Sequence, residues 1–140
     1  MANSRVKGSQ FERDVVNALR LDLGDIISTD LQRNLEQTRD GGCDIVIDGL
    51  WAVECKRYAK GNWYAEAWLE QCYRQANKIN MIPMLVWKYD RQPLRVTMPL
   101  YAIGMEFHFE EEHGFPTEGN AVRPITMDWD TAMLIVRESL

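Results

Sequence analysis

The chain has 140 residues, of which 46% are hydrophobic, and a formal net charge of −5 at pH 7. This length predicts a single domain over residues 1–140, with room for a hydrophobic core. No apolar run approaches the ~20 residues of a membrane span, and the first residues lack the apolar stretch of a signal peptide. We therefore expect an intracellular, cytoplasmic protein with no membrane partner.

The three cysteines agree with that compartment. Cys43, Cys55 and Cys72 form neither an even disulfide framework nor a CxxC motif. We expect them to be small buried side chains in a reducing environment.

The negative charge is unevenly distributed along the chain. Residues 106–140 carry 8 Asp+Glu against 2 Lys+Arg, whereas residues 1–105 carry 13 against 14. The acidity therefore belongs to the C-terminal quarter and does not exclude a nucleic-acid partner. The surface around the central residues is expected to be basic, with these contributors: Arg33, Arg39, Arg57, Lys60, Arg74 and Lys78.

The first predicted element is a helix. Residues 1–8 are expected to form a flexible basic arm, and the sequence from Ser9 to Glu12 fits a capping box that starts a helix running to about Leu23. Glu12 is in line with the inward-facing apolar residues of this helix. It is therefore a candidate site residue, although a simple capping role is an equal alternative. A first strand is expected over residues 26–35, followed by a polar loop.

A β-hairpin is predicted next, over residues 42–56. Two β-branched, apolar runs flank the turn signal Asp48-Gly49, and their continuous apolar character indicates strands covered on both sides. Asp44, Glu54 and Lys56 are charged residues within these runs. The alternative is a surface hairpin in which Glu54 and Lys56 form a solvated pair.

The register of the hairpin decides whether the charged residues meet. A two-residue loop of Asp48 and Gly49 would place Asp44 on the face opposite Glu54. A three-residue loop that includes Ile47, with Gly49 at positive φ, or an equivalent bulge, would instead place Asp44 opposite Ala52 and diagonal to Glu54. Two carboxylates at that separation suit Mg²⁺ or Mn²⁺ acting on a phosphate, with Lys56 acting on the water or the transition state. We expect this second register.

A second helix and two strands follow. The helix is expected from about Trp63 to Asn80, with Gln71 and Gln75 on the edge of its buried stripe, where they contact a phosphate or are ordinary edge residues. Strands are expected over residues 82–89 and 94–98. The order of elements predicts an α/β fold with a mixed central sheet flanked by helices.

The C-terminal part contains an acidic, loop-rich segment over residues 106–127 and a last helix over residues 128–140. His108 and His113 are poorly spaced for a helix-borne metal pair and are expected in a solvated loop. The apolar stripe of the helix is expected to dock onto the sheet or onto a partner subunit.

The motifs, taken in order, resemble those of a known group of enzymes. Glu12, Asp44, Glu54-x-Lys56 and a later helix with Gln71 resemble the PD-(D/E)xK nuclease superfamily. The segments Lys7-Gly-Ser-Gln-Phe-Glu-Arg13, Gly-Cys-Asp44-Ile and Val-Glu54-Cys-Lys56 are most similar to archaeal-type Holliday junction resolvases, which viruses and phages also carry. The likeness extends over nearly the whole chain.

The resemblance implies a restriction-endonuclease-like fold, a homodimer, and Mg²⁺-dependent phosphodiester hydrolysis on four-way DNA junctions in recombination and repair. It implies that Glu12, Asp44 and Glu54 are metal-site carboxylates and that Lys56 is the catalytic lysine, and Gln71 matches a helix glutamine loosely. The DNA-binding candidates are Lys7, Arg33, Arg39, Arg57, Lys60, Arg74 and Gln75. If phage- or virus-encoded, the protein would act in the host cell.

Three departures from the resolvases bear on junction specificity. Cys43 stands where a proline often precedes the aspartate, residues 33–39 replace a Ser/Gly-rich loop, and the C-terminal segment is acidic. Two alternatives therefore remain: a PD-(D/E)xK nuclease for restriction, nicking or repair, and a catalytically silent DNA-binding module.

Overall fold

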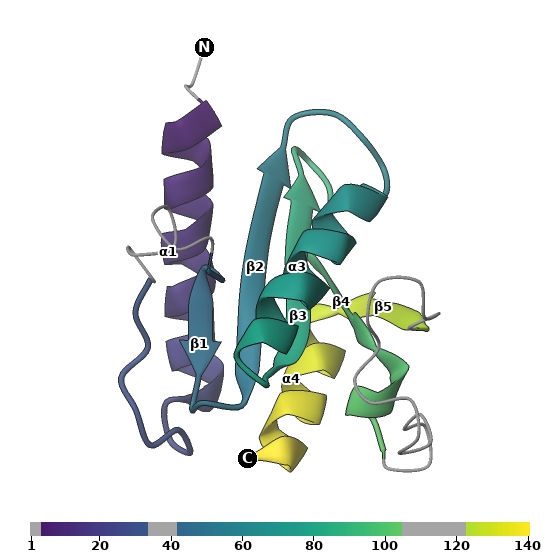
Figure 1. Ribbon diagram of the computed structural model, residues 1–140. Helices are drawn as coiled ribbons and strands as arrows, with labels where there is room; N and C mark the ends of the chain where they lie inside the picture. The colour runs from purple at the N-terminus through teal and green to yellow at the C-terminus, as the bar shows by residue number, and fades with distance from the viewer. Residues whose placement is uncertain (1–3, 34–41, 105–122) are drawn as a thin grey trace.

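The computed structural model describes residues 4–33, 42–104 and 123–140, with side chains from residue 7 onward. A five-stranded sheet lies between helices, with strand order β1-β2-β3-β4-β5 (Figure 1). Only β2 and β3 are parallel; the other neighbouring strands are antiparallel. The elements are α1 (Ser4–Leu23), β1 (Ile45–Ile47), β2 (Trp51–Tyr58), α3 (Glu66–Lys78), β3 (Ile82–Tyr89), β4 (Arg95–Pro99), the 3-10 helix η1 (Leu100–Ala102), β5 (Pro124–Asp128) and α4 (Trp129–Ser139). The predicted α/β fold with a mixed sheet is confirmed.

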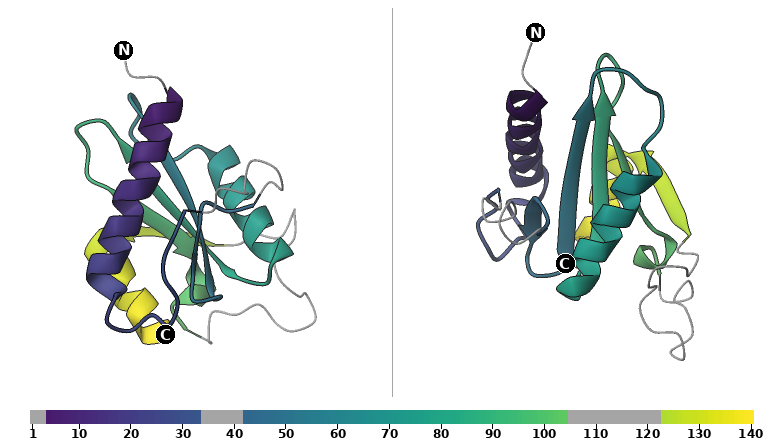
Figure 2. Two further views of the ribbon diagram at one scale, coloured as in Figure 1. Left: turned by 90° about the vertical axis from the view of Figure 1, so that its left-hand side faces the viewer. Right: turned by 45° about the horizontal axis from the view of Figure 1, so that its top comes forward.

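The helices cover the two faces of the sheet separately. Helices α1 and α4 lie on one face and α3 on the other (Figure 2). Along β2, Trp51 and Val53 pack against α1 and α4, whereas Ala52 packs against Ala76 of α3. Strand alternation therefore directs Glu54 and Lys56 toward α3.

The N-terminal helix begins earlier than the sequence predicted. Helix α1 starts at Ser4, so the expectations of a flexible arm over residues 4–8 and of a helix start at Ser9 are wrong. The early start is stabilised by Lys7, whose Nζ lies 2.8 Å from Asp90 Oδ2 at the far end of β3. The helix then buries one stripe against the sheet: Phe11, Val15, Val16, Leu19 and Leu23.

The strand predicted over residues 26–35 does not form within the part described. Arg33 makes one isolated bridge with Ile45, and residues 34 and 35 lie outside the described ranges. The reason is Asp48, whose carboxylate accepts hydrogen bonds from the backbone N–H groups of Ser28 (2.8 Å) and Thr29 (2.9 Å). Those donors are satisfied by a side chain instead of a neighbouring strand.

The C-terminal part differs from expectation at one point. Residues 124–127 were expected in a loop-rich segment and Asp128 in the last helix, but residues 124–128 form β5, which pairs with β4. Residues 105–122, with His108 and His113, lie outside the described ranges. Helix α4 begins at Trp129, and Asp128 caps it by accepting a hydrogen bond from the Thr131 N–H (2.7 Å). Its buried stripe docks onto the sheet, as predicted.

The predictions for the centre of the chain are confirmed. Strand β3 has the predicted bounds, β4 is displaced by one residue, and α3 is shorter than expected because residues 63–65 belong to the preceding loop. Among the described helices, none is both long and apolar enough to cross a membrane.

Candidate active site

The turn between β1 and β2 sets the register of the site. Asp48 (φ 48°) and Gly49 (φ 68°) form a two-residue turn in which the Leu50 N–H donates to the Ile47 carbonyl (2.9 Å). Yet Ile47 pairs with Trp51, so Leu50 is an extra residue that bulges from the start of β2. The predicted one-residue shift is confirmed and takes the form of a bulge, which was one of the two predicted forms. The pairing differs from the prediction, because Ala52 pairs with Val46 instead of lying opposite Asp44.

This shift brings Asp44 to the Glu54 side of the hairpin. The Asp44 N–H donates to the Val53 carbonyl (2.9 Å), and Asp44 Oδ2 accepts a hydrogen bond from the Cys55 N–H (2.7 Å). The carboxylate thus takes the place of a backbone acceptor just before β1 begins, where β2 extends past the end of β1. Only 5% of the residue is exposed.

Glu54 and Lys56 form a chain of contacts that reaches α3. Glu54 is 4% exposed, and its Oε1 lies 3.4 Å from Lys56 Nζ. Lys56 Nζ in turn donates a hydrogen bond to Gln71 Oε1 (3.0 Å). The structure therefore joins three of the predicted site residues by direct contacts, Glu54, Lys56 and Gln71. Asp44 lies close enough for the charge of Glu54 to act on it.

Burial and mutual repulsion act on the two carboxyl groups. Burial first, and the charge of Glu54 second, raise the pKa of Asp44 to about 8. Burial also raises the pKa of Glu54 to about 7, although Lys56 opposes that shift. Two buried carboxylates that repel each other are costly to keep ionised without a cation, so the pair is suited to binding one.

Glu12 approaches from α1 but is held by another residue. Arg33 Nε donates to Glu12 Oε2 (2.8 Å), and the charge of Glu12 contributes to the raised pKa values of Asp44 and Glu54. Within residues 4–33, 42–104 and 123–140, no three His, Cys, Asp or Glu side chains converge as a metal-binding group. The ligand role of Glu12 therefore stays a prediction.

The donor atoms at Asp44 and Glu54 fit a hard divalent cation. Glu54 Oε2 is buried and has no hydrogen-bond partner in the described part of the chain, which is an expensive state for a carboxylate oxygen. Mg²⁺ is typically bound by one or two carboxylates and keeps several waters. These two side chains could hold such an ion, with water and substrate oxygens as the remaining ligands.

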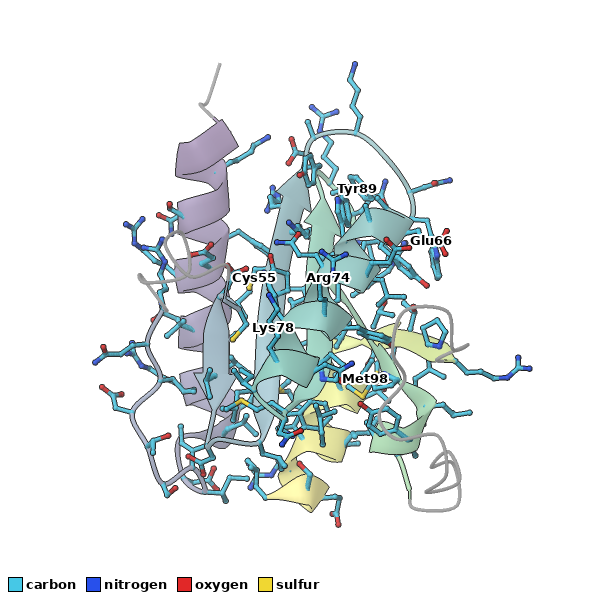
Figure 3. The ribbon with its side chains drawn as sticks, viewed as in Figure 1. Cys55, Glu66, Arg74, Lys78, Tyr89 and Met98 are labelled. Carbon is cyan, nitrogen blue, oxygen red and sulfur yellow. The ribbon has the colours of Figure 1, made fainter. Side chains whose placement is uncertain are left out.

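The predicted DNA-binding residues have different environments. Lys7 and Arg57 both bind Asp90 (2.8 and 2.9 Å), and Arg33 binds Glu12. Lys60 and Arg74 are exposed, and Arg74 lies on α3 in front of the sheet (Figure 3). Gln75 Oε1 is buried and has no partner in the described structure, which does not match a surface contact. Arg39 lies outside the described residues.

Two contacts at the site were not foreseen from the sequence. Arg33 binds Glu12, which lies 21 residues earlier in the chain. The Asp48 carboxylate accepts a hydrogen bond from the N–H of Ser28, which lies 20 residues earlier, and so fixes the loop after α1. No local sequence signal marks either pair. None of the three cysteines forms a disulfide among the described residues; Cys43 and Cys72 are buried as expected, whereas Cys55 is half-buried. Burial raises the pKa of each thiol.

The comparisons with known proteins agree with the motifs. The chain is similar to the structure of Archaeoglobus fulgidus Hjc, a Holliday junction resolvase from an archaeal hyperthermophile, with 20% identity, coverage of 91% of this chain and 88% of that chain, and a TM-score of 0.48. The search of curated proteins found no match. Residues 3–112 match the model of the family described as "Phage putative PDDEXK endonuclease". The chain therefore belongs to this phage PD-(D/E)xK endonuclease family.

Proposed function

We propose that this protein is a divalent-metal-dependent DNA endonuclease that cuts branched DNA, with the four-way junction as its substrate. One observation carries the chemistry: Asp44 and Glu54 are both buried and close enough for the charge of Glu54 to raise the pKa of Asp44, one carboxylate oxygen of Glu54 is unpartnered among the described residues, and Lys56 lies 3.4 Å from the other. A structural ion pair would satisfy both carboxylate oxygens.

Each side chain has a distinct part in the proposed reaction. Asp44 and Glu54 would hold Mg²⁺ or Mn²⁺, which when bound neutralises phosphate charge and acidifies water. Lys56 has three ammonium protons and can donate to a phosphate oxygen as negative charge develops there. Gln71 positions that ammonium from α3. Water adds to phosphorus, the P–O bond to one sugar breaks, and the departing oxygen takes a proton.

The hydrogen bond from Cys55 to Asp44 fixes one carboxylate. Because Asp44 Oδ2 already accepts from this backbone N–H, the side chain cannot rotate freely. The position of the proposed cation is thereby set by the backbone of β2.

The motif order supports branched DNA as the substrate, because it is most similar to that of Holliday junction resolvases. Recognition through backbone contacts and DNA shape is then the economical expectation. Paired cuts across a four-way junction need two equivalent sites, which a homodimer supplies.

The direct test is cleavage of three substrates of one sequence composition in Mg²⁺: a four-way junction, a flap and a linear duplex. We expect paired cuts near the branch point of the junction and slow or no cutting of the duplex. Equal cutting of all three would support a nuclease without junction preference. No cutting in Mg²⁺ or Mn²⁺ would contradict the proposed function.

A further inference from the structure

A pair of stacked aromatic rings lies next to the proposed site. Tyr58 and Trp68 stack face to face, with ring centroids 4.8 Å apart and planes 9° from parallel. Tyr58 follows Lys56 by two residues on the same face of β2, which corresponds to about 7 Å along the strand. Trp68 precedes Gln71 by nearly one turn of α3. The aromatic pair therefore forms the next layer beyond the contact between Lys56 and Gln71.

Two aromatic side chains near the C-terminal ends of β2 and β3 are exposed, although neighbouring residues hold them in place. Tyr58 is 47% exposed and Trp63 is 52% exposed. Trp63 packs edge-on against Trp87 (5.4 Å, 73°), and its carbonyl accepts a hydrogen bond from the Tyr89 hydroxyl (2.6 Å). Large aromatic rings exposed on a fixed backbone are preorganised to bind another flat group.

The charge around these rings favours an anionic partner. Residues 55–65 and 87–95, which comprise the ends of β2 and β3 and the loops that follow them, contain six Lys and Arg side chains and one acid, Asp90; Glu66 at the start of α3 is the next acid along the chain. Asp90 is already neutralised by Lys7 and Arg57. Arg95 lies over Trp87 (5.1 Å) and binds the Asn62 carbonyl (2.8 Å), so it also fixes the loop that carries Trp63. Tyr89 and the start of α3 at Glu66 mark this end of the molecule in Figure 3.

We propose that Tyr58, backed by Trp68, and Trp63 form a stacking platform for an unpaired nucleobase of DNA next to the phosphate that is cut. Exposed aromatic rings with flanking cations are how proteins bind single-stranded nucleic acid, because every base has a π face. A continuous duplex hides those faces in its own stack. The substrate class is therefore DNA with unpaired bases beside the cleavage point. This inference rests on the proposed nuclease function and names its substrate.

The test compares ligands that differ only in their bases. Binding is measured in EDTA by fluorescence anisotropy, with oligothymidylate, an abasic oligonucleotide of the same length and a linear duplex. The variants are Tyr58→Ala, Tyr58→Phe and Trp63→Ala. The matched control is Leu21→Ala, which removes an 87% exposed apolar side chain from α1. Urea unfolding of each variant verifies that the fold is retained.

We expect Tyr58→Ala or Trp63→Ala to weaken oligothymidylate binding about 5- to 100-fold, the range for losing one stacked base. Binding of the abasic oligonucleotide should change less than about twofold, since only phosphate contacts remain. Tyr58→Phe and Leu21→Ala should match wild type. Equal losses on the abasic ligand, or no loss in either alanine variant, would overturn the proposal.

Failure of this inference is distinguishable from failure of the nuclease proposal. If Tyr58→Ala and Trp63→Ala cut all DNA substrates like wild type and bind them equally well, the platform is refuted and the nuclease stands. If oligothymidylate binding depends on Tyr58 but no DNA is cut in Mg²⁺, the nuclease is refuted and the platform stands.

Discussion

Lys56 is the residue whose removal should separate chemistry from binding. Its ammonium contacts Glu54 on its own strand and Gln71 on α3, and both contacts direct it into the site. We predict that Lys56→Ala lowers the cleavage rate about 100-fold or more and changes DNA binding little. Single-turnover cleavage and anisotropy measure the two effects. Lys78→Ala, which removes an equal charge from the exposed surface of α3, is the control and should cut normally.

The two buried carboxyl groups should make metal-free stability depend on pH. Asp44 and Glu54 have folded-state pKa values of about 8 and about 7, above the usual value near 4. The folded state keeps protons that the unfolded chain releases, so the free energy of unfolding falls as pH rises from about 4 through about 8. We predict a falling urea midpoint between pH 5 and pH 9 in EDTA.

The amide variants isolate this effect from other titrating groups. Asp44→Asn and Glu54→Gln cannot ionise, and the amide oxygen that Asp44→Asn introduces can still accept the hydrogen bond from the Cys55 N–H. Each should flatten the pH profile and be more stable than wild type at pH 9 in EDTA. If the urea midpoint of both variants depended on pH as that of wild type does, the pKa values of Asp44 and Glu54 would not be raised, and the prediction would be wrong.

At the scale of elements, the loop between β2 and α3 is held by one glycine. Gly61 has φ 152°, and a Cβ built there would overlap the ring of Tyr89. We predict that Gly61→Ala lowers the free energy of unfolding by about 1–3 kcal/mol through backbone strain and the clash. The control is Gly8→Ala, where a Cβ meets no atom within 4 Å on α1. It should stabilise by about 0.5–1 kcal/mol. Equal effects in urea unfolding would contradict this account.

Elements with strong periodicity were predictable from the sequence. The bounds of β3 followed from a continuous apolar run, which is buried on both faces of the sheet, and most of α3 followed from a helical stripe that buries one face. The start of α1 was predicted five residues too late, because Ser9 and Glu12 have the residue types and spacing of a capping box although they lie inside the helix. The loop after α1 was misread as a strand because its apolar residues suggest pairing. Only the structure shows that the backbone N–H groups of this loop, at Ser28 and Thr29, donate to the Asp48 carboxylate.

The site was predictable as far as strand alternation reaches. Glu54 and Lys56 are two residues apart, so strand alternation alone placed them on one face of the sheet. Bringing Asp44 to that face required a one-residue shift in the register of the hairpin. The bulge at Leu50 that provides the shift was not predictable, because Asp48-Gly49 allows several registers. The register that forms is the one that buries Ile45, Ile47 and Trp51 completely on the α1 side. The pairing of Arg33 with Glu12 has no sequence signal because their separation is long.

For the whole molecule, we predict a homodimer with two-fold symmetry in solution. Paired cuts at a four-way junction call for two equivalent sites, and one self-complementary interface supplies them. The buried stripe of α4 is used within the chain, but Leu134 (66% exposed) and Leu140 (40% exposed) remain on its outer surface. Sedimentation equilibrium at micromolar concentration should give the mass of a dimer. A strictly monomeric species with full junction cleavage would refute it.

At the scale of the whole molecule, we expect the charge of the described residues to orient bound DNA. The cationic residues that follow β2 and β3 lie at the end of the sheet where these two strands terminate, beside the aromatic rings. DNA is therefore expected to approach this end, from which Lys56 and Glu54 lie two and four residues inward along β2.

The central claim is that Asp44 and Glu54 form one metal-dependent cleavage site with Lys56. It is tested most directly by the rate of junction cleavage in Mg²⁺ for Asp44→Asn and Glu54→Gln, each compared with wild type and with Asp30→Asn, which changes an exposed acid beside Arg20. Both amide variants should lose at least about 99% of the activity, and Asp30→Asn should retain it. Cleavage at near wild-type rate by either amide variant of the hairpin would contradict the account.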